Sequence, residues 1–165
     1  MPLAKSFTKP AAAGGSRWGG IPSAMPKTPM LNIGHEYDVE LVSFEETRNP
    51  GTGTESFKVT LKVVDGDDPH FKPGSAAVAI YMKHGKSLEM GMSKLKATAV
   101  AFAGCADDEE YDARDPSGAL IDATFNNVGE NLIGEKAHVK VTQGGAVKGK
   151  PGEYYQEYDW SPIGA

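Results

Sequence analysis

Two segments of this chain alternate between apolar and polar residues, and a third, residues 76–83, is assigned the same period of two; this feature restricts the possible folds more than any other. A period of two places successive side chains on opposite faces of a β-strand, so each segment is expected to form a half-buried strand. In the third segment, the phase of the alternation turns Tyr81 and Lys83 outward. The residues expected to point inward are Tyr37, Val39 and Leu41, then Phe57, Val59, Leu61 and Val63, and finally Ala76, Val78, Ile80 and Met82.

A helical pattern follows the third predicted strand. Ser87 is a suitable N-cap, and Glu89 falls in the first turn, where a negative charge favours the helix. Gly104 stands where a helix is expected to end. Apolar residues recur at steps of four and three, which predicts one buried stripe consisting of Leu88, Met92, Leu95, Ala99 and Phe102.

Two further strands are expected after Gly134. The fourth is indicated by the alternating apolar residues Ala137, Val139 and Val141. Residues 144–152 then form a hairpin loop, and residues 154–160 form the last strand. Three aromatic residues share one face of that strand and are interpreted as core: Tyr154, Tyr158 and Trp160.

The predicted order of three strands, one helix and two strands is that of the OB-fold. This fold is a five-stranded Greek-key barrel, and here the helix falls between the third and fourth strands. We therefore expect a mainly β domain over residues 31–165. An SH3-like barrel also has five strands, but it would not place a long amphipathic helix at this point. A sandwich capped by the helix stays open as an alternative.

Residues 1–30 differ in character from the rest of the chain. They are rich in proline, glycine and alanine and show no periodicity, so we expect a flexible arm. One interpretation is a disordered leader. The other is a clamp in which Arg17, Trp18 and Lys27 contact DNA or a neighbouring subunit, which would make the arm a route to a homo-oligomer.

Charge is distributed unevenly along the chain. The formal net charge is −5, but residues 1–30 hold four cations and no acid. Residues 105–135 hold nine acids against one arginine, so the remainder of the chain is close to neutral. This asymmetry permits nucleic-acid binding despite the acidic total.

Residues 105–135 are expected to form a long acidic loop with a short element at residues 119–125. The acidic run at residues 107–115 has three interpretations: a solvated flexible loop, a docking segment for a partner protein, or a phosphate mimic that competes for the cations of the barrel. Its carboxylates lack the spacing of a calcium-binding loop.

Motifs of the common enzyme classes are not found in this sequence. It contains no phosphate-binding loop with Gly-Lys-Ser/Thr, no Gly-x-Ser-x-Gly elbow and no His-Glu-x-x-His. Cys105 is the single cysteine, and its acidic neighbours disfavour a thiolate. The four histidines, His35, His70, His84 and His138, lack the spacing of metal ligands. We therefore expect a non-enzymatic protein without a metal or other cofactor.

The sequence also predicts where the protein resides. No apolar run approaches the roughly 20 residues that a membrane-spanning helix needs, and no signal peptide is recognised in residues 1–30. A single cysteine fits a reducing compartment. We expect a cytoplasmic protein that does not interact with a membrane.

The body of the chain resembles a family of phage-encoded OB-fold single-stranded DNA-binding proteins. The similar stretches are residues 37–43, 57–64, 71–75, 88–104 and 149–162, so the resemblance spans roughly residues 31–163. It implies a role in phage replication or recombination, in the cytoplasm of the host. Many proteins of this class end in an acidic tail that recruits replication partners, whereas this chain ends Ser161-Pro-Ile-Gly-Ala. The acidic loop therefore becomes the candidate segment for such partners.

Sequence-tolerant binding of single strands needs cations that follow the phosphates and flat side chains on which bases stack. The residues predicted to present these groups are Lys58, Lys62, Tyr81, Lys83, His84, Lys86, Lys140, Lys148, Lys150 and Tyr155. An exposed lysine on a strand also serves solubility and protects sheet edges. For Tyr81 two interpretations stay open, a stacking platform and a half-buried packing residue.

The function predicted from the sequence is protection or presentation of single-stranded DNA. The alternative is a virion or assembly protein that uses the barrel and the arm only for contacts between proteins.

Overall fold

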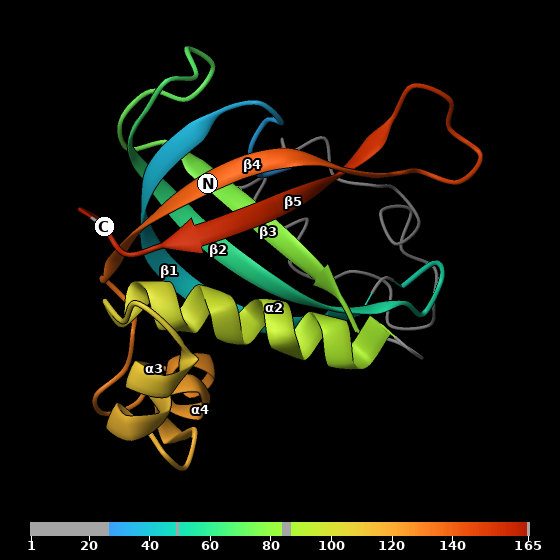
Figure 1. The fold of residues 1–165 in the computed structure, drawn as a ribbon. Coiled ribbons are helices and arrows are strands. Elements are labelled where there is room, and N and C mark those ends of the chain that lie inside the picture. Colours follow the sequence, from blue (N-terminus) through green and yellow to red (C-terminus); the bar gives the residue numbers. More distant parts are fainter. Residues whose placement is uncertain (1–26, 49, 84–86, 165) are drawn as a thin grey trace, which may run out of the picture.

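A computed structural model describes residues 27–48, 50–83 and 87–164 (Figure 1). The strands and helices follow one another in the order that the alternation predicts, with two additional helices before the fourth strand. The elements are β1 (Glu36–Arg48), β2 (Glu55–Gly66), β3 (Ala76–Met82), α2 (Ser87–Phe102), α3 (Asp108–Arg114), α4 (Ala119–Asn126), β4 (Lys136–Ala146) and β5 (Tyr154–Ser161). The fold class is therefore mainly β, as expected.

The five strands form one antiparallel sheet in the order β3-β2-β1-β4-β5. β1 lies at its centre and pairs with β2 along its length, but with β4 only through Glu36–Glu40. The register of β1 with β2 shifts at Asp38/Val39 and at Leu41/Ser43. Such irregularities accompany bending of a strand, and the sheet is curved (Figure 1). β3 and β5 are the edge strands, and no strand pairing joins them among the described residues. The sheet is curved but not closed.

Residues before β1 occupy part of the opening between β3 and β5. Met30 forms a parallel bridge with Val78 of β3, and the Val78 amide donates to the Pro29 carbonyl at 2.9 Å. On the other side, the Gln156 side chain of β5 donates to the Leu31 carbonyl at 3.5 Å. Leu31 is completely buried. The last residues of the predicted arm are thus part of the folded body, whereas residues 1–26 lie outside the described part.

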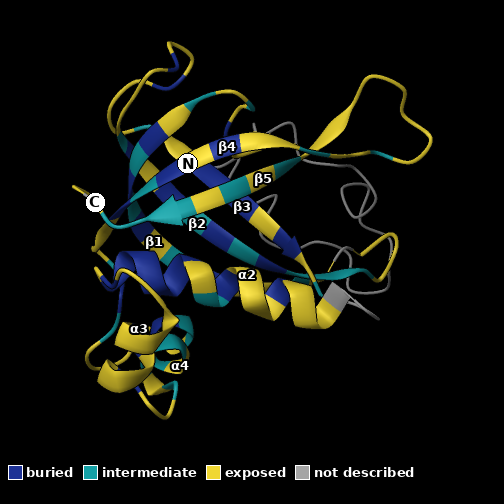
Figure 2. Ribbon diagram, in the orientation of Figure 1, coloured by how far each residue is buried: buried dark blue, intermediate teal, exposed yellow. Residues whose placement is uncertain are grey.

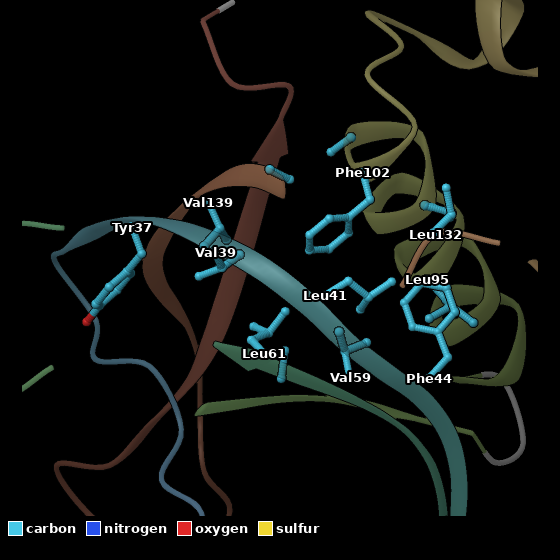
Figure 3. Close-up of a cluster of buried hydrophobic side chains, with 14 of the residues drawn as sticks. Tyr37, Val39, Leu41, Phe44, Val59, Leu61, Leu95, Phe102, Leu132 and Val139 are labelled. Atoms are coloured by element: carbon cyan, nitrogen blue, oxygen red, sulfur yellow. The ribbon is translucent and has the colours of Figure 1, made fainter. Parts of the chain in front are cut away.

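The core lies between the curved sheet and α2, and buried residues recur along β1, β2, β3, β4 and the second half of α2 (Figure 2). The inward residues predicted for β1, β2 and β4 are buried, and Figure 3 shows several of them meeting Leu95 and Phe102 of α2. α2 lies across one end of the sheet (Figure 1). It ends at Phe102, two residues before Gly104, which has a positive φ of 75°. At Gly91, a Cβ atom would stand 2.3 Å from the Met82 carbonyl oxygen. Only glycine therefore permits this approach of α2 to β3.

The predicted phase of β3 is wrong by one residue. Ala77, Ala79 and Tyr81 point inward, whereas Ile80 and Met82 are exposed. Val78 lies on the outward face but is buried, because Pro29 and Met30 cover it. The strand therefore carries apolar residues on both faces, and a one-residue slip exchanges the faces of every side chain.

The acidic run is helical, which corrects its interpretation as a flexible loop. The Asp107 side chain caps α3 by accepting a hydrogen bond from the Glu110 amide at 2.9 Å. Tyr111 is buried and donates to Asp115 at 2.9 Å, and Asp115 also accepts from the Leu120 amide. The short element expected at residues 119–125 is confirmed as α4. Of the stripe predicted for α2, Leu95, Ala99 and Phe102 are buried, but Leu88 and Met92 are exposed.

Within the described ranges, no helix combines the length and the apolar character that crossing a membrane requires.

Candidate nucleic-acid interface

A cleft of about 420 Å³ lies where the end of β3, the first half of α2 and the start of β5 come together. Its apolar lining includes Ile80, Met82 and Met90, which are exposed, and the ring of Tyr155, which is 55% exposed. Lys94 and Glu157 supply charges of opposite sign. The cleft thus combines an accessible aromatic ring, flexible thioether side chains and a cation in one concave surface.

The β4–β5 hairpin extends from the same region beyond the rest of the sheet (Figure 1). Its turn is held by backbone hydrogen bonds from Val147 to Glu153 and from Lys150 to Val147, at 2.9 and 3.2 Å. Lys148 and Lys150 are exposed, and the tip of the hairpin is yellow, the colour of exposed residues, in Figure 2. The hairpin therefore presents two lysines close in sequence to Tyr155.

Gly144 shapes the base of this hairpin. The pairing of β4 with β5 shifts register between Gln143 and Ala146. A Cβ atom at Gly144 would lie 2.8 Å from Cγ of Glu157 and 3.0 Å from the Tyr155 carbonyl oxygen. The close passage of β4 beside Tyr155 consequently depends on the missing side chain.

The outward lysines of the sheet do not form a basic surface. The outward residues of β1, between β2 and β4, include Glu36, Asp38 and Glu40. Lys62 of β2 pairs with Glu40 at 3.3 Å. Lys140 of β4 is exposed and stands in register with Glu36 on one side and Asp159 on the other. This face is balanced in charge, which the one-dimensional pattern of lysines did not reveal.

Lys83 is held by carboxylates rather than presented to solvent. Its ammonium group forms ion pairs with Glu46 and, at 3.7 Å, with Glu55. It also lies 5.3 Å from the centroid of the Phe57 ring. The hydrogen bond to Glu46 raises the pKa of Lys83. The Lys83 side chain is only 20% exposed, so its predicted outward orientation is wrong, and its charge is neutralised within the fold.

Tyr81 does not offer its ring to a ligand, so its prediction as a stacking platform is wrong. It is 4% exposed. Its hydroxyl lies 2.8 Å from the Thr98 hydroxyl and accepts a hydrogen bond from the Trp160 indole at 2.7 Å. Burial raises the pKa of Tyr81 to about 12. The packing interpretation is the correct one, because Tyr81 bridges β3, α2 and β5 across the opening of the sheet.

The remaining predicted site residues fall into three groups. Lys58 of β2 is half-buried and has no ion pair among the described residues. Lys27 is exposed, three residues before the bridge of Met30 to β3. The other four predicted contacts lie outside the described residues: Arg17, Trp18, His84 and Lys86.

Sequence reasoning missed Lys94, Met90 and Met82. Met90 and Lys94 are one helical turn apart on α2, so they share a face. That face is not the apolar stripe, and only its position beside the β3 edge makes it part of the cleft. Tyr154, interpreted as core, is 42% exposed at the start of β5.

His138 belongs to an ionic cluster on the outer face of the sheet. Its two ring nitrogens lie 2.8 Å from Asp38 and 3.2 Å from Glu36. The hydrogen bond to Asp38 is the main cause of the raised pKa of His138. No three histidine, cysteine, aspartate or glutamate side chains in the described ranges are arranged to hold a metal ion.

A search of protein-family models and of curated proteins finds no match to this chain.

Proposed function

We propose that this protein binds single-stranded DNA without strong sequence preference through an OB-fold barrel. The strand order β3-β2-β1-β4-β5, with a helix after β3 that covers one end of the sheet, supports this assignment. An OB barrel opened between its third and fifth strands would have this order of elements. The observation that carries the functional part is the cleft with Tyr155 and Lys94 beside the lysine-bearing hairpin.

The chemistry of the cleft fits an unpaired nucleotide strand. Bases stack on aromatic rings in a sequence-tolerant way, and each such contact contributes roughly 1–3 kcal/mol. Tyr155 is the stacking platform in this proposal, with Met82 and Met90 as an adaptable apolar floor. Lys94, Lys148 and Lys150 contact the phosphates. The ion pairs on the outer sheet face favour a path along the cleft and hairpin rather than over β1.

In this proposal, the affinity for single-stranded DNA falls progressively as the salt concentration rises. Each phosphate contact on a single strand contributes a slope of about −0.7 in log K against log salt. The three contacting lysines therefore give a slope of roughly −2. The resemblance of the sequence to phage single-stranded DNA-binding proteins supports a role in phage replication or recombination.

The test is fluorescence anisotropy with labelled oligo-dT at two salt concentrations. We expect Tyr155→Ala to weaken binding by roughly fivefold to a hundredfold, since one stacking contact is lost. The double variant Lys148→Ala/Lys150→Ala should weaken binding and reduce the salt slope. Lys62→Ala is the matched control, because its ammonium group is already paired with Glu40. Equal losses for Lys62→Ala and for the hairpin variant would contradict the proposed path.

Absence of binding at low salt would contradict the function itself. It would instead favour the alternative of an assembly protein that uses the barrel for contacts between proteins.

A further inference from the structure

A second cavity, of about 630 Å³, lies on the side of α2 away from the cleft. Its apolar walls come from β2, α2 and α4, namely Phe57, Leu95, Ile121 and Phe125. The rings of Phe57 and Phe125 have centroids 5.9 Å apart. Met92 lines the cavity and is 55% exposed, so the cavity opens to solvent beside α2. Such a pocket suits an aromatic side chain.

The polar lining of this cavity leaves one carboxylate without an ionic partner. Glu46 pairs with Lys83, and Lys96 pairs with Asp112 at 2.9 Å. The third charged residue is Asp122, whose carboxylate makes no ion pair among the described residues. α3 and α4 together contain five acids, Asp122 included, against Arg114. An occupant with an aromatic group next to a cation would complement this surface.

Residues 1–26 of the same chain carry that combination. They contain three cations and no acid, and Arg17 is adjacent to Trp18. We propose that Trp18 of the same molecule enters the cavity and that Arg17 pairs with Asp122. The docked arm would hold the N-terminal segment against α2 and α4. This inference is independent of DNA binding.

The chain is long enough for this contact. Met30 pairs in parallel with Val78, so the described chain starts toward the Ala76 end of β3, whereas Phe57 of the cavity stands in register with Tyr81 near the other end. The arm must therefore run back along the length of this strand. Nine residues separate Trp18 from Lys27 and span up to about 30 Å when extended. β3 has seven residues, or roughly 23 Å. Contact within one molecule also benefits from an effective concentration in the millimolar range.

The experiment is ¹⁹F NMR of the full-length protein labelled with 5-fluorotryptophan. The chain has two tryptophans, and Trp18→Phe assigns their signals. Trp160 packs against Phe102 and donates to Tyr81, so its signal reports whether a variant is folded. We expect the Trp18 signal to differ from its position in urea. We also expect it to return toward that position in Met92→Lys, which places a charge at the mouth of the cavity and repels Arg17.

Met90→Lys is the matched control, because Met90 is similarly exposed, at 59%, on the same helix but lines the other cleft. It should leave the Trp18 signal unchanged, whereas Asp122→Asn should shift it partly toward the urea position. A Trp18 signal already at the urea position in the wild type would overturn the proposal. So would a response to Met90→Lys without one to Met92→Lys. A Trp18 signal that moves on tenfold dilution would assign the contact to a second copy and overturn docking within one molecule.

Discussion

Asp68 is a buried carboxylate that ties the segment before β1 to the loop after β2. It accepts hydrogen bonds from the Tyr37 hydroxyl at 2.6 Å, from the Asn32 side chain at 2.8 Å and from the His70 amide at 2.9 Å. Burial alone would raise the pKa of Asp68, but these hydrogen bonds outweigh it and hold the pKa well below its usual range. The charged form of Asp68 is therefore the form that the fold stabilises.

The pH dependence follows from the sign of this shift. A lowered pKa in the folded state contributes stability above the unfolded value of about 4, and this contribution is lost as the pH falls toward the folded value. We expect Asp68→Asn to lower the free energy of unfolding at pH 7 by about 1.5–3 kcal/mol. Urea denaturation at pH 7 and pH 3 should show less loss of stability on acidification in the variant. The same acid dependence in both proteins would contradict this role.

The rings of Tyr158 and Tyr81 meet edge to face, with centroids 5.8 Å apart, but their hydroxyl groups differ in hydrogen bonding. The hydroxyl of Tyr158 is buried without a hydrogen-bond partner in the described part of the chain, whereas that of Tyr81 has two. We expect Tyr158→Phe to leave the free energy of unfolding unchanged or to increase it by up to about 1 kcal/mol. Tyr81→Phe should cost about 1–2 kcal/mol, since the Trp160 indole loses its acceptor. Equal effects in urea denaturation would contradict the assignment.

Gly91 determines how closely α2 can approach β3. An exposed glycine in a helix is usually improved by alanine, by about 1 kcal/mol. Here the added methyl group would meet the Met82 carbonyl oxygen, and α2 would have to move away from the sheet. We expect Gly91→Ala to cost roughly 1–3 kcal/mol. Ser93→Ala, at an exposed position two residues along α2, is the control. A higher melting temperature for Gly91→Ala would show that the helix has room to shift.

The sequence predicts which residues of a strand point inward, and where the helix lies, only for elements that contact the core with a single face. β1, β2 and β4 meet that condition, and their inward residues were predicted correctly. β3 does not, because Met30 covers Val78 from the other side. That contact joins residues 48 positions apart, and local alternation contains no information about it.

The candidate site was predictable to a similar extent. Tyr155, Lys148 and Lys150 follow from the hairpin pattern, which is local. The pairing of Lys62 with Glu40 and of Lys83 with Glu46 depends on which residues face each other across strands. Lys94 belongs to the cleft only because the β3 edge ends beside α2. The accessible cations are therefore a product of tertiary structure.

At the scale of the whole molecule, Leu31 fills the opening between the two edge strands. It is completely buried, and its carbonyl accepts from Gln156. We expect Leu31→Ala to cost about 2–5 kcal/mol, as for other buried leucines. Binding of oligo-dT by the remaining folded protein should weaken as well, because the cleft lies along the same opening. A loss below 1 kcal/mol in urea denaturation would mean that the edges hold together without this segment.

The hydrogen bond between Gln156 and Leu31 also joins parts of the chain that are 125 residues apart. During synthesis, residues 29–31 are made well before β5. Loop closure over so many residues is slow, and until β5 is made the edge of β4 that pairs with it has no partner. A nascent chain that stalls before β5 would therefore expose a free strand edge, and such chains should be the ones that aggregate or require a chaperone.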